Sequence, residues 1–506
     1  MKASRRARKV GGQSEEEAAG FPVVGVGASA GGLEALQQFI SHLTSDTGMA
    51  FVLIPHLSPE HKSALGEILS KSTRIPVSEV VASTSVEPNR IYIIPPNHDL
   101  SIKDGELVLE PLPSNAKVLR LPIDHFLTSL AEQRKDKAIG VILSGTGSDG
   151  TKGLQAIKAE GGITFAQRED TAKFPEMPMN AIIAGNVDYV LSPEEIAARL
   201  MKIKPRIETL ARKVEEYKDP AQEIAFQMIL ALLRTNTGVD FTHYRRSTLN
   251  RRINRRMILR NLDKIEDYAQ LLCNDLGEVE ALFQDVLINV TNFFRDKEAF
   301  DSLKTKALPK IVQGKDLENP VRVWVPACST GEEAYTIAIC FLEYIGDHYR
   351  DIPVQIFATD VNDQTIRRSR IGIYQGDTVE DLPRDILTRF FTQTNTRQYQ
   401  VKKNVRDMCI FAKHNVLTDP PFANMDLISC RNLLIYLDDS YQDRIVGIFH
   451  YTLRNGGFLM LGRSESVARF RDLFEAEDKE NKIYVKKASP APKVVMPFLP
   501  FKHKAE

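Results

Sequence analysis

One serine lies in a small-residue turn directly after an apolar run near the start of the chain. Residues 23–26 are apolar, the turn reads Gly27-Ala28-Ser29-Ala30-Gly31-Gly32, and apolar residues at helical spacing follow. A sharp turn from a strand into a helix, with glycines around a serine, presents the hydroxyl for nucleophilic attack. The same letters also match Gly-x-Gly-x-x-Ala, a form of the dinucleotide-binding fingerprint. The turn therefore predicts either a nucleophile or a nucleotide site.

Two polar residues that follow later apolar runs help to separate these alternatives. His56 comes directly after the run 51–55, and Asp149 comes after the run that begins at 141. The carboxyl ends of parallel strands meet at one crevice of a sheet, so we expect Ser29, His56 and Asp149 to lie together. They would supply the nucleophile, base and orienting acid of a hydrolytic triad. A dinucleotide site instead needs an acidic residue at the end of the second strand, where His56 stands.

A second strand–turn–helix pattern carries acidic residues at the start of its helix. Glu332 and Glu333 follow directly after the turn at residues 327–331. Their charges would repel a phosphate and favour a cationic cofactor. The next strand candidate ends at Asp360, where a carboxylate can bind ribose hydroxyls. The pattern predicts a site for S-adenosylmethionine rather than a nicotinamide, and it leaves open which of the two glutamates contacts the cofactor.

A basic helix is predicted between these two patterns. Leu249, Ile253 and Met257 share one face, and a separate arc of the helix carries arginines at 251, 252, 255 and 256. A solvated charged face is the ordinary explanation of such a pattern. Nucleic-acid binding is not favoured, because the region lacks interleaved aromatic residues and the chain as a whole has balanced charge.

The elements that must position these residues form two regions in which short apolar runs alternate with helical periods. This alternation predicts an α/β fold with doubly wound, mostly parallel sheets. A hairpin is expected between 91–94 and 107–109 at the edge of the first sheet. The strand candidates are 23–26, 50–54, 90–94, 138–143 and 162–166 in the first region, and 321–325, 354–358, 408–412, 426–429 and 457–461 in the second.

Domain boundaries are expected where composition or periodicity changes along the 506 residues. Pro205 should end a helix and begin a charged helical linker. We expect disordered tails at 1–19 and 489–506, α/β domains at 20–204 and 301–488, a helical linker at 205–219, a small all-α domain at 220–300, and an inserted β-subdomain at 378–405.

The cysteines and the lengths of the apolar runs indicate the cellular compartment of the protein. Five cysteines lie without metal-ligand spacing, which predicts reduced thiols and no metal site. No apolar run approaches the ~20 residues that span a bilayer, so no membrane insertion is expected. The first residues lack the apolar core of a secretion signal. These features predict a cytoplasmic protein.

Residues 21–200 resemble the bacterial chemotaxis protein-glutamate methylesterase. The resemblance rests on residues 27–32, 54–58, 91–98 and 142–150. It implies that Ser29 attacks the methyl ester of a receptor glutamate, with His56 as base and Asp149 orienting it. Backbone N–H groups at the helix start after Ser29 would hold the oxyanion. The sequence departs from the family at Thr146, where methionine is frequent, and it lacks the family's usual N-terminal receiver domain.

Residues from about 225 to 487 resemble the chemotaxis receptor methyltransferase. The resemblance rests on 289–295, 329–333, 358–360, 415–417 and 430–436. It implies S-adenosylmethionine as the cofactor, a Rossmann-like domain, and a receptor-docking role for the β-subdomain. It also implies that the basic helix approaches an acidic receptor stalk through Arg251 and Arg255. At the cofactor it places Asn289, Thr291, Arg295, Glu332, Asp360, Asn415, Val416, Arg431 and Asn432, with Tyr436 near the transferred methyl group and the substrate.

Together the two halves predict a bifunctional enzyme that acts in opposite directions on the same kind of glutamate. The expected partner is a methyl-accepting chemoreceptor or a similar glutamate-bearing signalling protein. A sensor kinase or response regulator is a further candidate, because fusions of this kind often continue into such regions. The alternative from another class is a receptor-binding signalling scaffold with one or both halves inactive. A serine hydrolase for an unrelated small ester is less favoured, since it leaves the second half unexplained.

Overall fold

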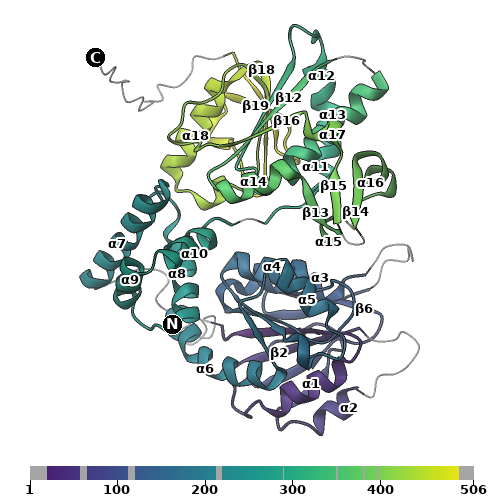
Figure 1. The fold of residues 1–506 in the computed structure, drawn as a ribbon, viewed down its shortest axis with the longest axis vertical. Coiled ribbons are helices and arrows are strands. Elements are labelled where there is room, and N and C mark those ends of the chain that lie inside the picture. Colours follow the sequence, from purple (N-terminus) through teal and green to yellow (C-terminus); the bar gives the residue numbers. More distant parts are fainter. Residues whose placement is uncertain are drawn as a thin grey trace, which may run out of the picture. The chain divides into compact units, whose positions relative to one another are not determined.

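The computed structural model describes residues 20–56, 65–111, 120–211, 219–288, 290–348, 352–379, 382–395 and 398–488 (Figure 1). The chain forms two compact units. The first comprises Met1–Leu232 and Arg246–Ile288, and the second comprises Leu233–Arg245 and Asn289–Glu506. The tails predicted to be disordered, 1–19 and 489–506, lie outside the described residues.

A seven-stranded sheet in the order β10-β9-β8-β1-β2-β5-β3 forms the centre of the first unit. Its middle strand β1 (Val23–Ala28) pairs in parallel with β2 (Ala50–Pro55) and β8 (Ala138–Ile142), and every residue of β1 is buried. A strand covered on both faces must be apolar throughout, which is why these runs were recognisable. The other strands are β3 (Val77–Glu79), β5 (Arg90–Ile93), β9 (Ile163–Gln167) and β10 (Tyr189–Leu191).

Helices cover both faces of this sheet, as a doubly wound fold requires. Figure 1 shows α3 (Pro122–Arg134), α4 (Thr151–Glu160) and α5 (Glu176–Ile183) on one side. On the other side lie α1 (Gly32–Ser41), α2 (Leu65–Ser70) and α6 (Pro193–Ala211). The predicted fold class is confirmed for this half.

The predicted hairpin is wrong in its partners. β5 pairs in parallel with β2 and β3 instead of with 107–109. Residues 107–109 belong to β7 (Glu106–Pro111), which pairs with β6 (His98–Lys103) and, with β4 (Thr84–Ser85), forms a separate three-stranded sheet. β6 escaped notice because only Leu100 and Ile102 are apolar in it, and both are fully buried.

Helix α6 continues through Pro205, where we expected it to end. A proline inside a helix removes a backbone donor and crowds the preceding turn, at a typical cost of ~3 kcal/mol. Burial of Ile203, Ile207 and Leu210 on the face of α6 around this proline offsets that cost. The remainder of the predicted linker, 212–218, lies outside the described residues.

The region predicted as a small all-α domain is helical. It comprises α7 (Pro220–Thr237), α8 (Arg246–Arg260), α9 (Ile265–Asn274) and α10 (Leu276–Val286). The Asp275 side chain caps α10 by accepting from the Glu278 N–H. Helices α8, α9 and α10 belong to the same compact unit as the first α/β domain.

The second unit is built on another seven-stranded sheet, in the order β16-β12-β11-β17-β18-β20-β19. Its buried Trp324 packs edge-on against Phe422 and Phe449. The strands are β11 (Val321–Pro326), β12 (Val354–Asp360), β16 (Cys409–Lys413), β17 (Met425–Cys430), β18 (Leu453–Leu461), β19 (Phe474–Asp478) and β20 (Ile483–Lys486). The helices are α11 (Lys297–Ser302), α12 (Leu308–Val312), α13 (Glu332–His348), α14 (Asp363–Ile371), α17 (Lys403–Arg406) and α18 (Asp439–Thr452).

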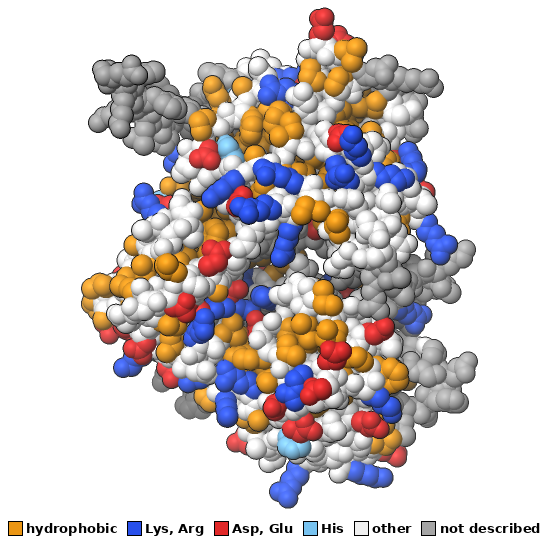
Figure 2. All heavy atoms as spheres, in the orientation of Figure 1, with side chains coloured by type: hydrophobic (Ala, Val, Ile, Leu, Met, Phe, Trp, Pro, Cys, Tyr) orange, Lys and Arg blue, Asp and Glu red, His pale blue; other side chains and the backbone are white. Residues whose placement is uncertain are grey.

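A small antiparallel sheet is inserted between β12 and β16, where a β-subdomain was predicted. It contains β13 (Ile373–Gln375), β15 (Gln398–Val401) and β14 (Phe391–Asn395), with α15 (Gly376–Val379) and α16 (Arg384–Phe390) beside them. Basic, acidic and apolar side chains are interspersed over the face seen in Figure 2. In the described ranges, none of the helices is both long and apolar enough to cross a bilayer.

Candidate active sites

Ser29 lies at the carboxyl end of β1, in the turn that leads into α1. Its N–H donates to the carbonyl of Ser144 at 2.9 Å, and its carbonyl accepts from the Gly32 N–H at 2.9 Å. Gly31 has a φ of 69°, in the left-handed region that favours glycine. A Cβ at Gly31 would lie 2.9 Å from the Ser144 Oγ and 2.9 Å from the Lys173 Cβ. Both the backbone conformation and the available space therefore favour glycine two residues after the serine.

The structure brings the three predicted triad residues into one hydrogen-bonded chain. Ser29 Oγ lies 3.0 Å from His56 Nδ1, and His56 Nε2 lies 2.9 Å from Asp149 Oδ2. The side chain of Asp149 is 2% exposed and that of His56 is 32% exposed. A buried acid, a partly exposed base and a hydroxyl within hydrogen-bond reach are the geometry of an activated nucleophile.

Two backbone donors also hold the carboxylate of Asp149. The Ile123 N–H donates to Oδ2 at 3.0 Å, and the Asp124 N–H donates to Oδ1 at 2.8 Å. Both donors belong to the first turn of α3, where a negative charge is favoured. Sequence reasoning missed this support, although Pro122 at the first helical position was a usable signal for the start of a helix.

Asp124 is itself a buried carboxyl group beside the triad. Burial, together with the nearby negative charge of Asp149, raises the pKa of Asp124 to about 8. Its Oδ1 accepts from the Gly153 N–H at 2.7 Å, in the first turn of α4. Nothing in the local sequence singles out Asp124.

The carboxylate of Asp360 fixes the loop after β11 to the end of β12. The Ser329 N–H donates to Asp360 Oδ2 at 2.9 Å, and the Asn362 N–H donates to Oδ1 at 2.9 Å. Ser329 and Gly331 have φ angles of 50° and 94°. A Cβ at Gly331 would lie 2.9 Å from the Ser369 Cβ. Burial raises the pKa of Asp360 above its ordinary value despite these donors.

The two glutamates at the start of α13 have different surroundings. Glu332 is 4% exposed, and burial raises its pKa to about 7. Glu333 accepts from the Ser429 Oγ at 2.6 Å and lies 3.6 Å from Arg431 Nη1. Glu333 is thus bound to the end of β17, whereas Glu332 accepts from the Thr330 hydroxyl of the loop itself at 2.6 Å.

Arg431 follows β17 directly and holds the segment before α11 against the sheet. Its Nη2 donates to the carbonyl of Arg295 at 2.8 Å and to Asp296 Oδ2 at 2.6 Å. The guanidinium lies 5.0 Å from the ring centre of Phe300. Its Nε is buried without a hydrogen-bond partner among the described residues. A buried donor of this kind fits an anionic group of a ligand better than it fits the bare protein.

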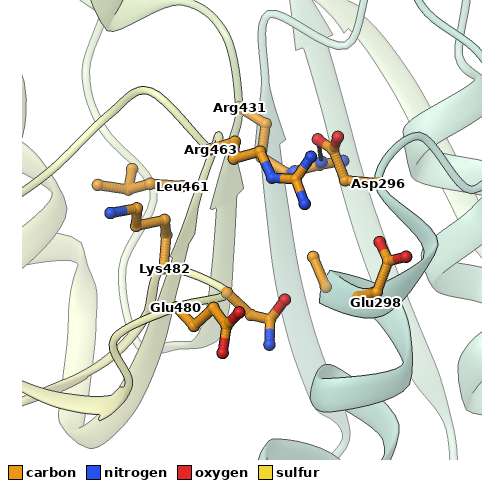
Figure 3. A pocket seen from close by; sticks show the side chains of 9 residues that line it. Asp296, Glu298, Arg431, Leu461, Arg463, Glu480 and Lys482 are labelled. Atoms are coloured by element: carbon orange, nitrogen blue, oxygen red, sulfur yellow. Dashed lines mark hydrogen bonds and ion pairs between the residues drawn. The ribbon is translucent and has the colours of Figure 1, made fainter.

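A shallow pocket lies beside Arg431. Figure 3 shows side chains of both signs around it, contributed by the start of α11, the end of β18 and the segment before β20. Of the predicted cofactor residues, Arg431 alone lines it among the described residues. The pocket is lined by Asp296, Glu298, Ala299, Arg431, Leu461, Arg463, Glu480, Asn481 and Lys482.

Glu465 shapes the turn that carries Asn432. Its carboxylate accepts from the N–H groups of Asn432 at 2.9 Å, Gly462 at 2.7 Å and Leu434 at 2.8 Å. Asn432 has a φ of 61°. Burial raises the pKa of Glu465. The sequence offered no local sign of this support, because Glu465 lies far along the chain from the turn that it holds.

The other predicted cofactor residues lie at the ends of neighbouring strands or in the segment before α11. Asn415 follows β16 and accepts from the Leu417 N–H at 3.0 Å. Val416 packs against the apolar cluster around Trp324. Arg295 Nη1 donates to the Val290 carbonyl at 2.9 Å, and Thr291 beside it is half-buried. Asn289 lies outside the described residues.

Tyr436 is held by a short segment that precedes α8. The Arg245 N–H donates to the Tyr436 carbonyl at 2.8 Å, and Tyr244 forms a β-bridge with Leu437. Burial raises the pKa of Tyr244, and the nearby charges of Asp360 and Tyr436 raise it further. The segment therefore brings a second tyrosine close to Asp360, which sequence reasoning missed.

Arg255 of the basic helix does not face a free surface, which corrects the expected receptor contact. It is 1% exposed, donates to the Gly162 carbonyl at 3.1 Å and to Asp285 at 2.5 Å, and also pairs with Asp188. Asp188 lies just before β10 and Asp285 lies on α10. The charge of Arg255 is therefore neutralised by carboxylates of the first unit.

The neighbouring arginines of α8 make contacts with the same part of the first domain. Arg252 is fully buried and donates to the Lys158 carbonyl at 2.8 Å and to the Ala159 carbonyl. Arg251 is half-buried, and its Cβ would lie 3.3 Å from a Cβ built at Gly161. In this arrangement the end of α4 covers the face that was expected to meet a receptor.

Models of known protein families match three parts of this chain. Residues 24–200 match the CheB methylesterase family, 224–287 match the CheR methyltransferase all-alpha domain, and 289–483 match the CheR methyltransferase SAM binding domain. The cofactor of the last domain is S-adenosylmethionine. The acidic, deeply placed groups around Asp360 and Glu332 and the buried donor of Arg431 fit a ligand with a cationic centre, a ribose and a carboxylate.

Individual relatives agree with these matches. A 104.1 kDa protein of Rhodobacter capsulatus is 35% identical over 442 residues, which are 83% of this chain and 46% of that protein, so this chain spans about half of its length. A Leptospira interrogans relative with the provisional name protein-glutamate methylesterase/protein-glutamine glutaminase is 32% identical over 36% of this chain and 95% of its own. The chemotaxis protein methyltransferase of Listeria monocytogenes is 30% identical over 49% of this chain and 92% of its own.

A solved structure is also similar to part of this chain. The Thermotoga maritima CheB methylesterase catalytic domain is 30% identical, covers 36% of this chain and 98% of its own, and has a TM-score of 0.34. From the family models and the relatives, the chain belongs to the chemotaxis methylesterase family through its first α/β domain and to the chemotaxis methyltransferase family through the remainder.

Proposed function

We propose that this protein both removes and adds methyl groups on glutamate side chains of methyl-accepting chemoreceptors. The observation that carries the proposal is the hydrogen-bonded chain from Ser29 through His56 to Asp149 in a domain of the methylesterase family. The same chain continues into a domain of the methyltransferase family. The presence of both domains in one chain supports the same kind of glutamate as the substrate of both activities.

For ester hydrolysis, His56 takes the proton of Ser29 while Oγ attacks the ester carbonyl carbon. Backbone N–H groups of the turn between Ser29 and α1 would stabilise the oxyanion. His56 then donates its proton to the departing methoxide, so methanol leaves and an acyl-enzyme remains. Water, deprotonated by His56, hydrolyses that acyl-enzyme and restores Ser29. Asp149 keeps the imidazole oriented and stabilises its positive charge in both halves of the cycle.

For methyl transfer, S-adenosylmethionine supplies an electrophilic methyl group when it is bound. Glu332 is our choice for the contact near the cationic end, because Glu333 is already bound to Ser429. Asp360 would hold the ribose hydroxyls, and the buried Nε of Arg431 would meet the carboxylate of the cofactor. Tyr436 would orient the glutamate at the methyl group. Roles at the cofactor for Asn289, Thr291, Arg295, Asn415, Val416 and Asn432 belong to the same proposal.

The acceptor glutamate is ionised at neutral pH, so the transfer needs alignment and partial desolvation rather than a strong base. The expected location is the cytoplasm, where the glutamates of such receptors are modified. A sensor kinase or response regulator as a further partner remains part of this proposal. An inactive scaffold is not favoured, since the triad geometry and the acidic cofactor site are both retained.

A labelled-methyl assay on purified chemoreceptors tests the proposal. The Ser29→Ala variant should add methyl groups and fail to release methanol. The Asp360→Ala variant should release methanol from premethylated receptor and fail to add methyl groups. Each variant is the matched control of the other, because both domains remain present. If the wild-type protein neither adds nor removes methyl groups on any chemoreceptor tested, the proposal fails.

A further inference from the structure

Helices α3 and α4 begin side by side, and each supplies the cap of the other. Neither has a side-chain cap at its own N-cap residue, Leu121 or Gly150. Instead Asp149, just before α4, accepts from two N–H groups in the first turn of α3. Asp124, in the first turn of α3, accepts from the Gly153 N–H in the first turn of α4 at 2.7 Å. The two aspartates thus form a reciprocal cap.

The surrounding residues leave this arrangement little freedom. A Cβ at Gly153 would lie 2.5 Å from the Leu127 Cβ, so α4 packs directly on α3. Gly150 has a φ of 93°, and a Cβ there would lie 2.3 Å from the Ile142 side chain. Because Gly150 joins Asp149 to α4, a shift of the start of α4 would move Asp149. The Asp149 carboxylate lies 2.9 Å from His56 Nε2, so its displacement would also change the position of the His56 imidazole.

We propose that Asp124 is a positioning residue of the esterase site, which fixes Asp149 by tying the start of α4 to the start of α3. The inference rests on the proposed esterase function, since it concerns the same triad. Asp124 acts through the backbone and touches neither Ser29 nor a substrate. Its raised pKa suits this role, because a protonated Asp124 leaves the negative charge of the pair on Asp149, beside the imidazole.

An alkyl fluorophosphonate tests this without knowledge of the natural substrate. Ser29 Oγ attacks the phosphorus, a P–O bond forms, fluoride leaves, and His56 takes the hydroxyl proton. For Asp124→Ala the maximal rate of labelling should fall about tenfold or more, because a small misplacement of a catalytic group is costly. The concentration for half-maximal rate should stay within about twofold of wild type. Asp124→Asn keeps an acceptor oxygen for Gly153 and should retain most of the rate.

The matched control is Asp275→Ala, which removes the cap of α10, where Asp275 accepts from the Glu278 N–H at 3.1 Å. Like Asp124→Ala, it should lower the midpoint temperature of thermal unfolding, but it should leave the labelling rate unchanged. Asp124→Ala labelling at the wild-type rate would overturn the inference, as would equal losses in Asp124→Ala and Asp275→Ala. If Asp124→Ala does not fold, Asp124→Glu, which displaces the acceptor, must slow labelling for the inference to stand. Wild-type protein that fails to label contradicts the proposed esterase instead.

Discussion

Arg255 on α8 and Asp285 on α10 form a buried ion pair, with Nη1 2.5 Å from Oδ2 and side chains 1% and 9% exposed. A second carboxylate, Asp188, meets the same guanidinium. One arginine therefore balances two acids, one from the esterase domain and one from the all-α domain. Removal of a single partner from a buried pair leaves an uncompensated charge, which is far more costly than loss of a surface pair.

We expect Arg255→Ala to lower the free energy of unfolding of the first unit by about 3–5 kcal/mol. Urea unfolding, followed by the transition of that unit, measures the change. Arg206→Ala is the matched control, because Arg206 pairs with the exposed Asp263 at 2.7 Å. That variant should cost at most about 1 kcal/mol. Equal effects of the two substitutions would mean that Arg255 contributes little at the buried contact.

Asp149→Asn should reduce ester hydrolysis by about 10⁴-fold with little change in folding. The asparagine NH₂ would face one of three donors, which come from Ile123, Asp124 and His56. Methanol release from premethylated receptor is the measurement. Asp170→Asn, at an exposed pair with Arg168, is the control and should act like wild type. Activity of Asp149→Asn within tenfold of wild type would exclude Asp149 as the orienting acid.

Cofactor binding should depend on pH through Glu332, whose pKa is raised to about 7 by burial. Below that pH the carboxyl is neutral, and above it the anion favours the sulfonium of S-adenosylmethionine. The affinity ratio of S-adenosylmethionine to the neutral S-adenosylhomocysteine should therefore rise between about pH 6 and 8. Calorimetric titration of both ligands measures the ratio. Glu332→Gln should flatten the dependence, whereas Glu475→Gln, at an exposed position of β19, should keep it.

Glu332 also affects stability, with the opposite dependence. Its folded pKa lies above the ordinary value of 4.5, so the folded state holds more protons between about pH 4.5 and 7. The ligand-free protein should lose stability as pH rises through this window. Thermal unfolding of wild type and Glu332→Gln across that range checks the sign. If the stability of the wild type instead rises with pH relative to that of Glu332→Gln, the pKa of Glu332 is lower in the folded state than in the unfolded state, and the prediction is wrong.

Arg431→Lys should weaken S-adenosylmethionine binding by about tenfold. Arginine binds Asp296 and the Arg295 carbonyl from one planar group and still offers a buried Nε, which lysine cannot reproduce. Equilibrium dialysis measures the affinity. Arg463→Lys is the control, since Arg463 lines the pocket in Figure 3 without being a predicted cofactor residue. If Arg463→Lys loses more affinity than Arg431→Lys, then Arg463 rather than Arg431 contacts the carboxylate of the cofactor.

The sequence was most informative where a residue's neighbours along the chain determine its surroundings. β1, β2 and β8 are buried on both faces, so each is a continuous apolar run, and the triad residues follow at their ends. β6 was missed because its apolar residues, Leu100 and Ile102, alternate with polar residues and look like part of a loop. Pro205 was misjudged because local geometry opposes a helix that tertiary burial maintains.

Contacts between distant residues could not be predicted in the same way. Asp124 and Gly153 are far apart in the sequence, and nothing in either local segment signals that one caps the other's helix. Arg255 looks like a surface residue by type, and it becomes a core residue because Asp188 and Asp285 neutralise it. Burial of charge depends on partners that hydropathy does not detect.

The contact of α8 with the end of α4 limits how the protein can be divided. A chain cut at residue 220, the boundary expected from the sequence, would strip Arg252 of the Lys158 carbonyl and Arg255 of Asp188 and the Gly162 carbonyl. The severed methyltransferase would carry a helix of uncovered arginines, and the severed esterase would carry unmatched carbonyls and an unpaired acid. Helix α8 and the first α/β domain therefore belong to one structural unit, and exchange of modules between relatives would have to carry both sides of this contact together.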